Sequence, residues 1–467
     1  MYSLHDVKIT GLSLDKILAC EIQSHIGEHS TLKLSGLVEN EEEFLYGVSD
    51  GQDIEVIIQG SEGTKILFSG IVTGVSITES GQMKTACVEG KSRSWLMDRT
   101  KHSRSFQNAH ITFQALTQEI LKDYTGSSLI YTGDSQEIGN LIIQYEETDW
   151  DFLKRVLSLV GLALTPDSQK AGLKLFAGVP KFPETALSYT VLEMDKDMDS
   201  YYYLKANKRE VHAADFTQYI ISSEQLMGIF DTAAVQGQSL AVYAYQYSFE
   251  QQEMIGTYCL QSAKGLVVQA SYPMHLIGAA LMAKVVRVSK NKIQAAMEID
   301  GAHIERTVHW FPYSTLSASP DGSGWYCMPE IDDDVRIYFP SKQEAEAIAL
   351  SAVSNYDAPQ GGSDRMQDPN NRYFRTKYGQ ELALNADSVK LSCNEDKSSI
   401  SILTDGTIRI QAQESVNVQA KEKITLHAEN ELSIRVKDQF LMQSNQGGLV
   451  LSEGNKIIIR GTEVKFD

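Results

Sequence analysis

The chain has 467 residues, of which 42% are hydrophobic and 22% are charged, and its formal net charge at pH 7 is −19. This composition is typical of a globular protein, and the length allows about three domains. The negative charge argues against a nucleic-acid-binding protein, because such proteins carry a concentrated basic face that this sequence lacks. No run of about 18 apolar residues is present, which argues against a membrane-spanning helix.

The N-terminal segment and the cysteines indicate where the chain folds. The first residues, MYSLHDVKITG, lack the basic stretch and apolar core of a secretory signal. The five cysteines (Cys20, Cys87, Cys259, Cys327 and Cys393) are scattered, with neither a CxxC pair nor a zinc-ligand spacing. We therefore expect free thiols, no metal site, and a chain that is made and folded in the cytoplasm.

The first 260 or so residues are predicted to be rich in strands, with two helices between them. Short alternating apolar runs broken by glycine predict strands over residues 1–100. One helix is predicted to begin at Thr112 and end at Gly126, and a second is predicted to be capped by Thr148 and to end at Gly161. The tyrosines at 201–203 and at alternate positions over 243–247 are interpreted as strand packing rather than a binding stripe.

Two further segments precede the C-terminal region. Residues from about 275 to 355 form another strand-rich unit, of the size of an OB fold. Residues 356–380 are rich in Gly, Asp, Asn and Pro, which predicts a linker or collar.

An eight-residue repeat dominates the C-terminal region. In each octad, two large apolar residues and then a small residue stand at every second position. A polar trio such as Lys421-Glu422-Lys423 follows them. Apolar residues at every second position predict a strand with one buried face, so each octad predicts one short strand and one turn. The large apolar residues of the strict repeat are predicted to lie along the axis of a β-helical rod: Ile400, Ile402, Ile408, Ile410, Val416, Val418, Ile424, Leu426, Leu432, Ile434, Phe440 and Met442.

Two arrangements of these octads fit the pattern. One octad buries too few side chains to offset its own chain entropy, so octads must stack. A single chain could wind alone as a three-sided solenoid, or three chains could intertwine, each supplying one face per layer. The narrow apolar column favours three chains, because a three-fold axis leaves little room.

Four segments ahead of the repeat carry motifs in a fixed order. They are residues 70–75 (GIVTGV), 94–107 (SWLMDRTKHSRSFQ), 146–155 (EETDWDFLKR) and 324–340 (GWYCMPEIDDDVRIYFP). Together with the octads, they resemble the VgrG-type central spike proteins of type VI secretion systems and contractile phage tails. Each motif alone is weakly specific, but the ordered set covers essentially the whole chain. Asp332 stands where that family often has glycine, and aspartate tolerates positive φ, so we expect the turn there to persist.

The resemblance implies a mainly β chain in four parts. Residues 1–262 would form a hub of two tube-like β-domains with short helices, and residues 263–355 an OB-fold β-barrel. Residues 356–380 would form the linker or collar, and residues 381–467 an intertwined triple-stranded β-helix. In the OB part, Trp325, Pro329, Val335 and Phe339 are expected to be the structural signature.

The resemblance also implies a mechanical function. A homotrimer would present six β-domains to a six-fold tube, and its rod would puncture the target envelope when a sheath contracts. The expected partners are an Hcp-like tube protein, baseplate proteins, a PAAR-like tip protein and effector cargo, with no nucleic acid and with a membrane only as the pierced target. Such a particle would assemble in the cytoplasm and be ejected toward the extracellular space or a target cell. The type of contractile system is left open.

Residue types found in catalytic and metal sites occur here without the spacing that such sites need. Asp332-Asp333-Asp334 is interpreted as a solvated acidic loop, and His303, His309 and Cys327 as scattered side chains. Neither Gly-x-Ser-x-Gly nor His-Glu-x-x-His is present. We therefore expect no catalytic, cofactor-binding or metal-binding residues and no cofactor. Two alternatives stay open: a trimeric tail fibre or adhesin, and a spike enzyme that degrades envelope polymer.

Overall fold

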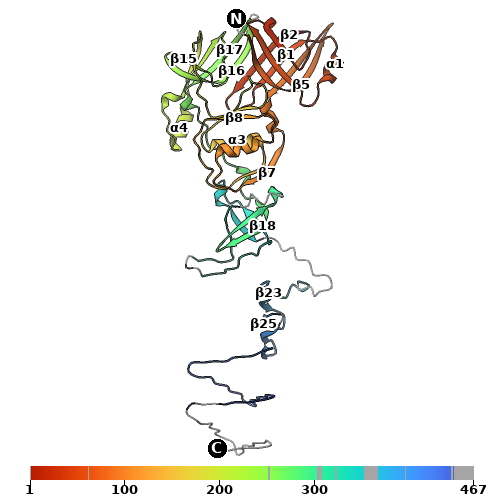
Figure 1. The fold of residues 1–467 in the computed structure, drawn as a ribbon, viewed down its shortest axis with the longest axis vertical. Helices are drawn as coiled ribbons and strands as arrows, with labels where there is room; N and C mark the ends of the chain where they lie inside the picture. Colours follow the sequence, from red (N-terminus) through yellow and green to blue (C-terminus); the bar gives the residue numbers. More distant parts are fainter. Residues whose placement is uncertain are drawn as a thin grey trace, which may run out of the picture. The chain divides into compact units, whose positions relative to one another are not determined.

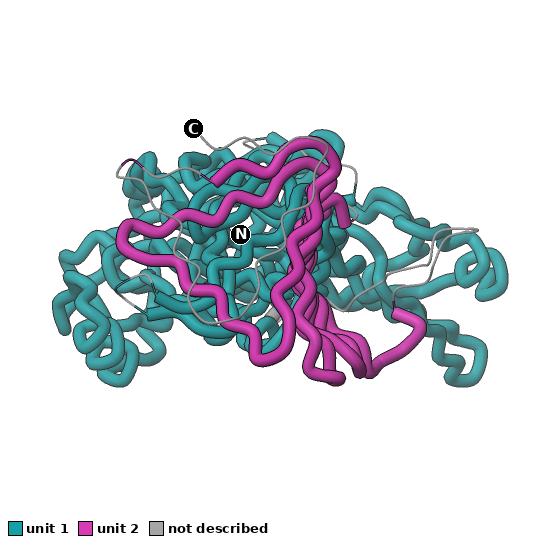
Figure 2. Tube along the Cα trace, turned by 90° about the horizontal axis from the view of Figure 1, so that it is seen from below, with its two compact units in different colours: residues 1–354 teal, residues 355–467 magenta. Residues whose placement is uncertain are grey.

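The computed structural model describes residues 2–60, 63–250, 253–301, 308–319, 321, 323–351, 366–394, 396–442 and 445. The chain divides into two compact units, Met1–Ser354 and Asn355–Asp467, which Figure 2 colours teal and magenta. Strands are the main element of both units, which confirms the mainly β fold class.

A twelve-stranded sheet is the largest element of unit 1 and is built from two stretches of the chain (Figure 1). Its order is β1-β4-β5-β6-β3-β2-β16-β17-β14-β13, and β15 pairs with both β16 and β12. The first stretch supplies β1 (Val7–Thr10), β2 (Lys16–His25), β3 (Thr31–Leu37), β4 (Asp53–Gly60), β5 (Gly63–Ser80) and β6 (Met83–Ser92). The second supplies β12 (Glu184–Thr185), β13 (Thr190–Lys196), β14 (Thr217–Ser223), β15 (Thr232–Val235), β16 (Gln238–Glu250) and β17 (Glu253–Gln261).

One hydrophobic core serves both halves of this sheet. Antiparallel pairing of β2 with β16 joins the halves, and fully buried side chains from each half, such as Ile22, Phe68 and Tyr247, share the core. Burial of large apolar side chains is the main stabilising contribution here, at about 1.5–3 kcal/mol for each.

The two tyrosine tracts lie in different types of secondary structure. Tyr245 and Tyr247 lie in β16 and are buried, as predicted. The interpretation of residues 201–203 as strand residues is wrong, because they lie in helix α4 (Met198–Ala206). Asp197 caps that helix by accepting a hydrogen bond from the Ser200 amide at 3.0 Å, and this local signal outweighs the β preference of tyrosine.

A smaller layer with helices follows the large sheet along unit 1 (Figure 1). It contains α2 (Phe113–Leu121), α3 (Asp149–Ser158), β7 (Lys101–Phe106), β8 (Ser128–Tyr131), β9 (Ile142–Thr148), β10 (Leu164–Pro166) and β11 (Lys174–Ala177). Both predicted caps are confirmed: Thr112 Oγ1 accepts from the Ala115 amide and Thr148 Oγ1 from the Asp151 amide. Helix α2 ends at Leu121, earlier than the predicted Gly126. A further short helix, α1 (Glu41–Gly47), lies between β3 and β4.

The last part of unit 1 is a five-stranded antiparallel sheet with the order β20-β19-β18-β21-β22. Its strands are β18 (Ala280–Ser289), β19 (Lys292–Met297), β20 (Phe311–Pro312), β21 (Asp334–Tyr338) and β22 (Ile348–Ser351), with the short 3-10 turns Glu298–Asp300 and Glu344–Glu346. Strand β9 connects this sheet to the helical layer. Ile142 packs in the helical core, whereas Leu141 and Ile143 pack in the core of the five-stranded sheet, because successive side chains of a strand point to opposite faces.

Unit 2 contains an antiparallel meander. Its strands are β23 (Arg372–Arg375), β24 (Glu381–Leu384), β25 (Ser388–Cys393), β26 (Ser398–Leu403) and β27 (Ile408–Ala412), paired in chain order. Residues 413–442, all of them described, form no helix or strand in this single copy. Within the described parts of both units, no helix is long and apolar enough to cross a membrane.

The cap of α3 gives a test of the helical layer. Thr148 accepts from the Asp151 amide and also donates to Asp98 Oδ1 at 2.7 Å, so Thr148→Ala removes two hydrogen bonds. We expect it to lower the free energy of unfolding by about 1–2 kcal/mol in urea titrations. Thr112→Ala, which removes the cap of α2, is the matched control and should cost less. Equal losses of unfolding free energy in the two variants would show that the hydrogen bond from Thr148 to Asp98 contributes nothing to stability.

Candidate functional site

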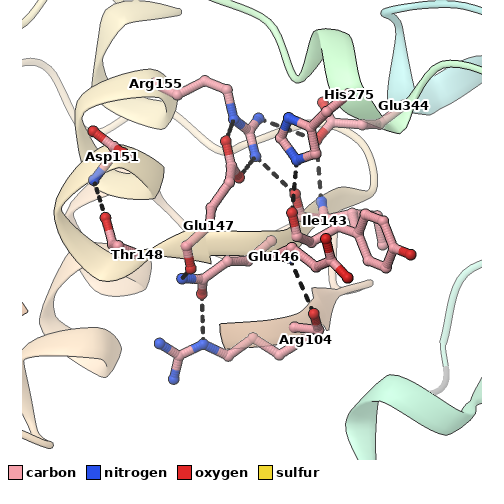
Figure 3. Close-up of polar contacts among 12 residues, drawn as sticks. Arg104, Ile143, Glu146, Glu147, Thr148, Asp151, Arg155, His275 and Glu344 are labelled. Atoms are coloured by element: carbon pink, nitrogen blue, oxygen red, sulfur yellow. Dashed lines mark hydrogen bonds and ion pairs between the residues drawn. The ribbon is translucent and has the colours of Figure 1, made fainter. Parts of the chain in front are cut away.

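A buried arginine lies where the helical layer meets the five-stranded sheet, and we refer to the polar contacts around it as the junction (Figure 3). The Arg155 side chain is 4% exposed. Its Nε and one terminal nitrogen donate to both oxygens of Glu147, at 2.9 and 2.7 Å. The same terminal nitrogen donates to the Ile143 carbonyl at 2.7 Å, and the other donates to Glu344 Oε1 at 3.2 Å. Arg155 therefore ties α3 and β9 to the 3-10 turn that precedes β22.

Glu344 completes the junction from the side of the five-stranded sheet. Its Oε1 also accepts from the Ile143 amide at 3.1 Å. Burial raises the pKa of the Glu344 carboxyl above its ordinary value, although the nearby Arg155 cation opposes this rise. The carboxyl groups of Glu147 and Glu344 share one guanidinium in this buried cluster. Such clusters fix geometry more reliably than they add stability.

A second set of contacts joins the same two layers through β7. The Ser105 amide and hydroxyl donate to the two oxygens of Asp300, at 2.6 and 2.5 Å. The Gln107 side chain accepts from the His309 amide at 3.2 Å. Arg104 pairs with the buried Asp149 and donates to Gln144 at 2.7 Å. The segments 103–107 and 146–155, singled out in the sequence, thus meet in one place.

Asp300 and Glu344 make buried contacts between the two layers that sequence reasoning missed. Each is an isolated acidic residue, 195 positions from Ser105 and 189 positions from Arg155 respectively. Nothing in the local sequence marks them, and only the packing of the two layers brings them to their partners.

A cavity of roughly 630 Å³ opens beside the junction. Its lining includes Lys101, Glu146, Lys154, Tyr272 and His275. His275 Nε2 is hydrogen-bonded to the Tyr145 carbonyl at 2.6 Å (Figure 3). The cavity wall therefore mixes cations, carboxylates and aromatic rings, and it contains no group of three or more potential metal ligands among the described residues.

A serine–histidine–aspartate arrangement lies near the N-terminus of α3. His29 Nδ1 is 2.7 Å from Ser94 Oγ, and His29 Nε2 is 3.5 Å from Asp98 Oδ2. Burial lowers the pKa of His29 to about 4, and its ring packs on Trp150. The Ser94 side chain is only 1% exposed, so its hydroxyl has no path to a substrate. These residues serve packing between the large sheet and α3, not nucleophilic catalysis.

The second candidate surface is an apolar face of the unit 2 sheet. Residues directly opposite one another in an antiparallel ladder share a face. Two columns of such residues run across the strands: Phe374, Leu382, Leu391, Ile400 and Ile410 in one, and Leu384, Val389, Ile402 and Ile408 in the other. Their exposed fractions range from 37% to 66%. A groove of roughly 490 Å³ lies along the first column.

The structure places the predicted signature residues in two environments. Val335 and Phe339 are fully buried in the core of the five-stranded sheet. Trp325 is 55% exposed and Pro329 is half-buried, on the loop between β20 and β21. Asp332 has a φ of +73°, in agreement with the expected glycine-like turn. His303 lies outside the described residues, and among the residues that are described, His309 and Cys327 belong to no group of three or more potential metal ligands.

The predicted axial residues of the repeat are all exposed in a single copy. Their exposed fractions range from 44% to 72%, for Ile400, Ile402, Ile408, Ile410, Val416, Val418, Ile424, Leu426, Leu432, Ile434, Phe440 and Met442. Their axial position stays a prediction, because one copy alone gives them nothing to pack against.

Removal of the Glu344 charge tests the electrostatics of the junction. Because the folded chain raises the pKa of Glu344, it binds this proton more tightly than the unfolded chain does. The stabilising contribution of protonation is present at acid pH and is lost as the pH rises through the raised pKa. We expect Glu344→Gln, which stays neutral, to gain thermal stability relative to the parent chain as the pH rises from about 4 to 7. The exposed Glu346→Gln is the control and should show no such trend; a matching trend there would contradict the assignment.

Removal of the Arg155 cation tests how much the junction depends on the positive charge between its two carboxyl groups. Arg155→Met leaves Glu147 and Glu344 buried without their cation, which costs about 3–5 kcal/mol at neutral pH. The loss should shrink in mildly acid solution, where protonation removes the uncompensated charge. Urea unfolding at two pH values measures both quantities, and a loss independent of pH would show that packing rather than charge dominates.

Comparison with known proteins identifies the fold. Residues 30–187 match the family described as phage tail baseplate hub (GPD). The E. coli c3393 protein is a type VI secretion component with structural similarity to T4 bacteriophage tail proteins gp27 and gp5. It is 15% identical to this chain with a TM-score of 0.55, and the match covers 74% of this chain and 99% of that one.

Two structures of the Francisella PdpA–VgrG complex are also similar. Each is 11% identical with a TM-score of 0.54 and covers 87% of this chain; the match covers 88% of the half-lidded form's chain and 80% of the lidded form's. No curated protein matches this sequence. The predicted resemblance is confirmed: residues 30–187 match the model of the phage tail baseplate hub family, and the chain has the fold of VgrG-type hub-spike proteins.

Proposed function

We propose that three copies of this chain form the central spike of a contractile injection machine, with a hub that meets the inner tube and a C-terminal rod that pierces the target envelope. The baseplate-hub match over residues 30–187 and the hub-spike fold support the general role. The observation that carries the trimeric rod is the apolar face of unit 2, which one copy leaves uncovered.

Exposed apolar columns favour several chains over a single-chain solenoid. A chain that winds alone would cover its columns with its own next turns. Here residues 413–442, which the structure describes in full, form no strand, and residues such as Val418 and Leu426 remain more than 70% exposed. Burying each large side chain between copies would contribute about 1.5–3 kcal/mol, which is enough over many octads to hold three chains together.

The large sheet of unit 1 supports a role as tube adapter. It divides into two six-stranded halves, drawn from residues 7–92 and 184–261, around one core. Three copies would supply six such halves, which matches a six-fold ring. In this proposal residues 1–262 are the hub, 263–355 an OB-fold domain, 356–380 a collar and 381–467 a triple-stranded β-helix.

Such a spike would be a structural protein and not an enzyme. Its partners would be an Hcp-like tube protein, baseplate proteins, a PAAR-like tip protein and effector cargo. It would assemble in the cytoplasm within a contractile particle and be ejected toward the extracellular space or a target cell.

The native mass of the purified chain tests the proposal. Light scattering at two concentrations should give a stable particle of three times the 51.9 kDa chain mass. A monomer at both concentrations would contradict the trimeric spike and place the adhesin and enzyme alternatives ahead of it.

A substitution in the repeat tests which residues hold the particle together. Ile424→Asp would place three unpaired carboxylates near one axis, at a cost of several kcal/mol. We expect this variant to be a monomer in light scattering, with unit 1 still folded by circular dichroism. Thr425→Asp, one position along and on the opposite face of the strand that the octad pattern predicts, is the control and should remain a trimer. A trimeric Ile424→Asp would show that this residue is not axial.

A further inference from the structure

A single histidine of the large sheet reaches into the helical layer, and we call its contacts there the His29 contact. His29 lies on the loop between β2 and β3, and its side chain is 12% exposed. Its ring lies against the Trp150 ring of α3, with the two centroids 4.3 Å apart. Its Nδ1 is 2.7 Å from Ser94 Oγ in the 3-10 turn Arg93–Asp98. A titratable ring therefore lies at the centre of a contact between two layers.

Hydrogen bonds around the ring favour one neutral form of the imidazole. The Ser30 amide donates to Ser92 Oγ at 3.1 Å, and Ser92 Oγ is 2.8 Å from Ser94 Oγ. When Ser92 donates to Ser94 and Ser94 donates to Nδ1 of the ring, each hydroxyl proton has an acceptor and Nε2 carries the ring proton. The other neutral form would turn the Nε2 lone pair toward the Asp98 carboxylate, 3.5 Å away. We therefore assign the ring proton to Nε2 of His29.

This network has no place for a second ring proton. A proton on Nδ1 of His29 needs Ser94 Oγ as its acceptor, so the Ser94 hydroxyl must turn toward Ser92. The Ser92 hydroxyl then loses its acceptor, and it has no other among the described residues. On the far side of the ring, Nε2 has no hydrogen-bond partner within the described structure that would offset this loss. Because a buried hydroxyl without a partner is unfavourable, protonation of the ring weakens the contact.

Charged groups face the ring from each element packed against its loop. Asp98 of the 3-10 turn favours the protonated ring, whereas Lys91 near the end of β6 and Lys154 of α3 disfavour it. Asp151 of α3 interacts with Asp98, and burial raises the pKa of the Asp151 carboxyl. The two cations and the burial of the ring act together against a positive charge on His29.

The other side of the loop borders a cavity of roughly 360 Å³ that β16 and β17 also line. Four further titratable residues are in its lining: His25, Glu28, Tyr245 and Cys259. Burial raises the pKa of Tyr245 to about 12 and also raises that of Cys259, so both stay neutral in mildly acid solution. His25 and Glu28 are the groups of this lining whose titration an experiment must separate from that of His29.

We propose that His29 is an acid-sensitive contact: its neutral ring holds the β2–β3 loop on α3, and protonation of the ring releases the loop while both layers stay folded. Burial lowers the pKa of His29 to about 4, and a released loop would restore the ordinary value of 6.5. The stabilising contribution of the neutral ring is therefore present above about pH 6.5 and is lost as the pH falls toward 4. In the proposed spike this release would loosen the hub in acid surroundings, but the contact itself needs only one copy.

Hydrogen–deuterium exchange of the full chain tests the release. The Gly27 amide, which donates to Thr165 Oγ1 at 3.1 Å, reports on the loop, and so does the Ser30 amide. After correction for the intrinsic exchange rate, their protection should fall about 20-fold between pH 7 and pH 5. This factor follows from a His29 pKa of 6.5 in the open loop and about 4 in the closed loop. The amides that pair β16 with β17 should keep their protection, because the large sheet stays folded.

Variants without a titratable ring isolate the contribution of His29. His29→Gln keeps hydrogen-bonding groups at this position, and His29→Phe keeps an aromatic ring against Trp150. In both variants the corrected protection of the loop should be independent of pH over this range. His25→Gln, on the same loop border, is the matched control and should show the same fall as the parent chain.

Four results would overturn the proposal. They are constant protection of the loop in the parent chain, an equal loss of protection in β16 and β17, a parent-like fall in a variant of His29, and a missing fall in His25→Gln. The last of these would assign the titration to His25. A parent chain that is monomeric would overturn the trimeric spike and leave the His29 contact standing, because the exchange measurement reports on one copy.

Discussion

Apolar side chains that one copy cannot bury are the constraint on which the rest of this molecule depends. In unit 2, antiparallel pairing aligns Phe374, Leu382 and Leu391 with Ile400 and Ile410 on one face, so every added strand lengthens an apolar column. The opposite face carries residues such as Lys390, Ser401 and Arg409, which suit water. A sheet with this division needs a partner on one side only. Because the repeat is eight residues long, the apolar residues of successive octads stay on that same side along the chain.

Unit 1 meets a different requirement, which is to connect two cores rigidly. Strand β9 does so because Ile142 enters one core, whereas Ile143 and Leu141, the residue just before the strand, enter the other. Arg155 reinforces the connection with bonds to Glu147, Glu344 and the Ile143 carbonyl. A hydrogen-bonded buried cluster has few alternative arrangements, so the two layers cannot slide over one another without exposing unpaired groups. In the proposed spike, such a connection would transmit an axial force between the two layers.

Much of this architecture follows from the sequence because its signals are local. The caps at Thr112 and Thr148 depend on residues three positions away, and the octads depend on a repeated short pattern. Asp332 could be expected at positive φ because its place in the turn motif calls for glycine. The error at residues 201–203 is also local: the cap at Asp197 decides for a helix where tyrosine alone suggests a strand. By contrast, Asp300 and Glu344 become part of the junction only through packing between distant layers, and no short-range pattern encodes that.

The two units deal with open strand edges and faces in different ways. In unit 1, the halves of the large sheet close on one another through β2 and β16, and an isolated bridge from Ser3 to Glu253 links the start of the chain to β17. The chain itself therefore satisfies those backbone groups. In unit 2, one copy leaves an apolar face uncovered. In the proposed trimer, the net charge of −19 on each chain would make the copies repel at long range until their apolar faces meet at short range. Assembly would then be favoured only in a register that buries the columns, since any shift by one residue would turn the polar face inward.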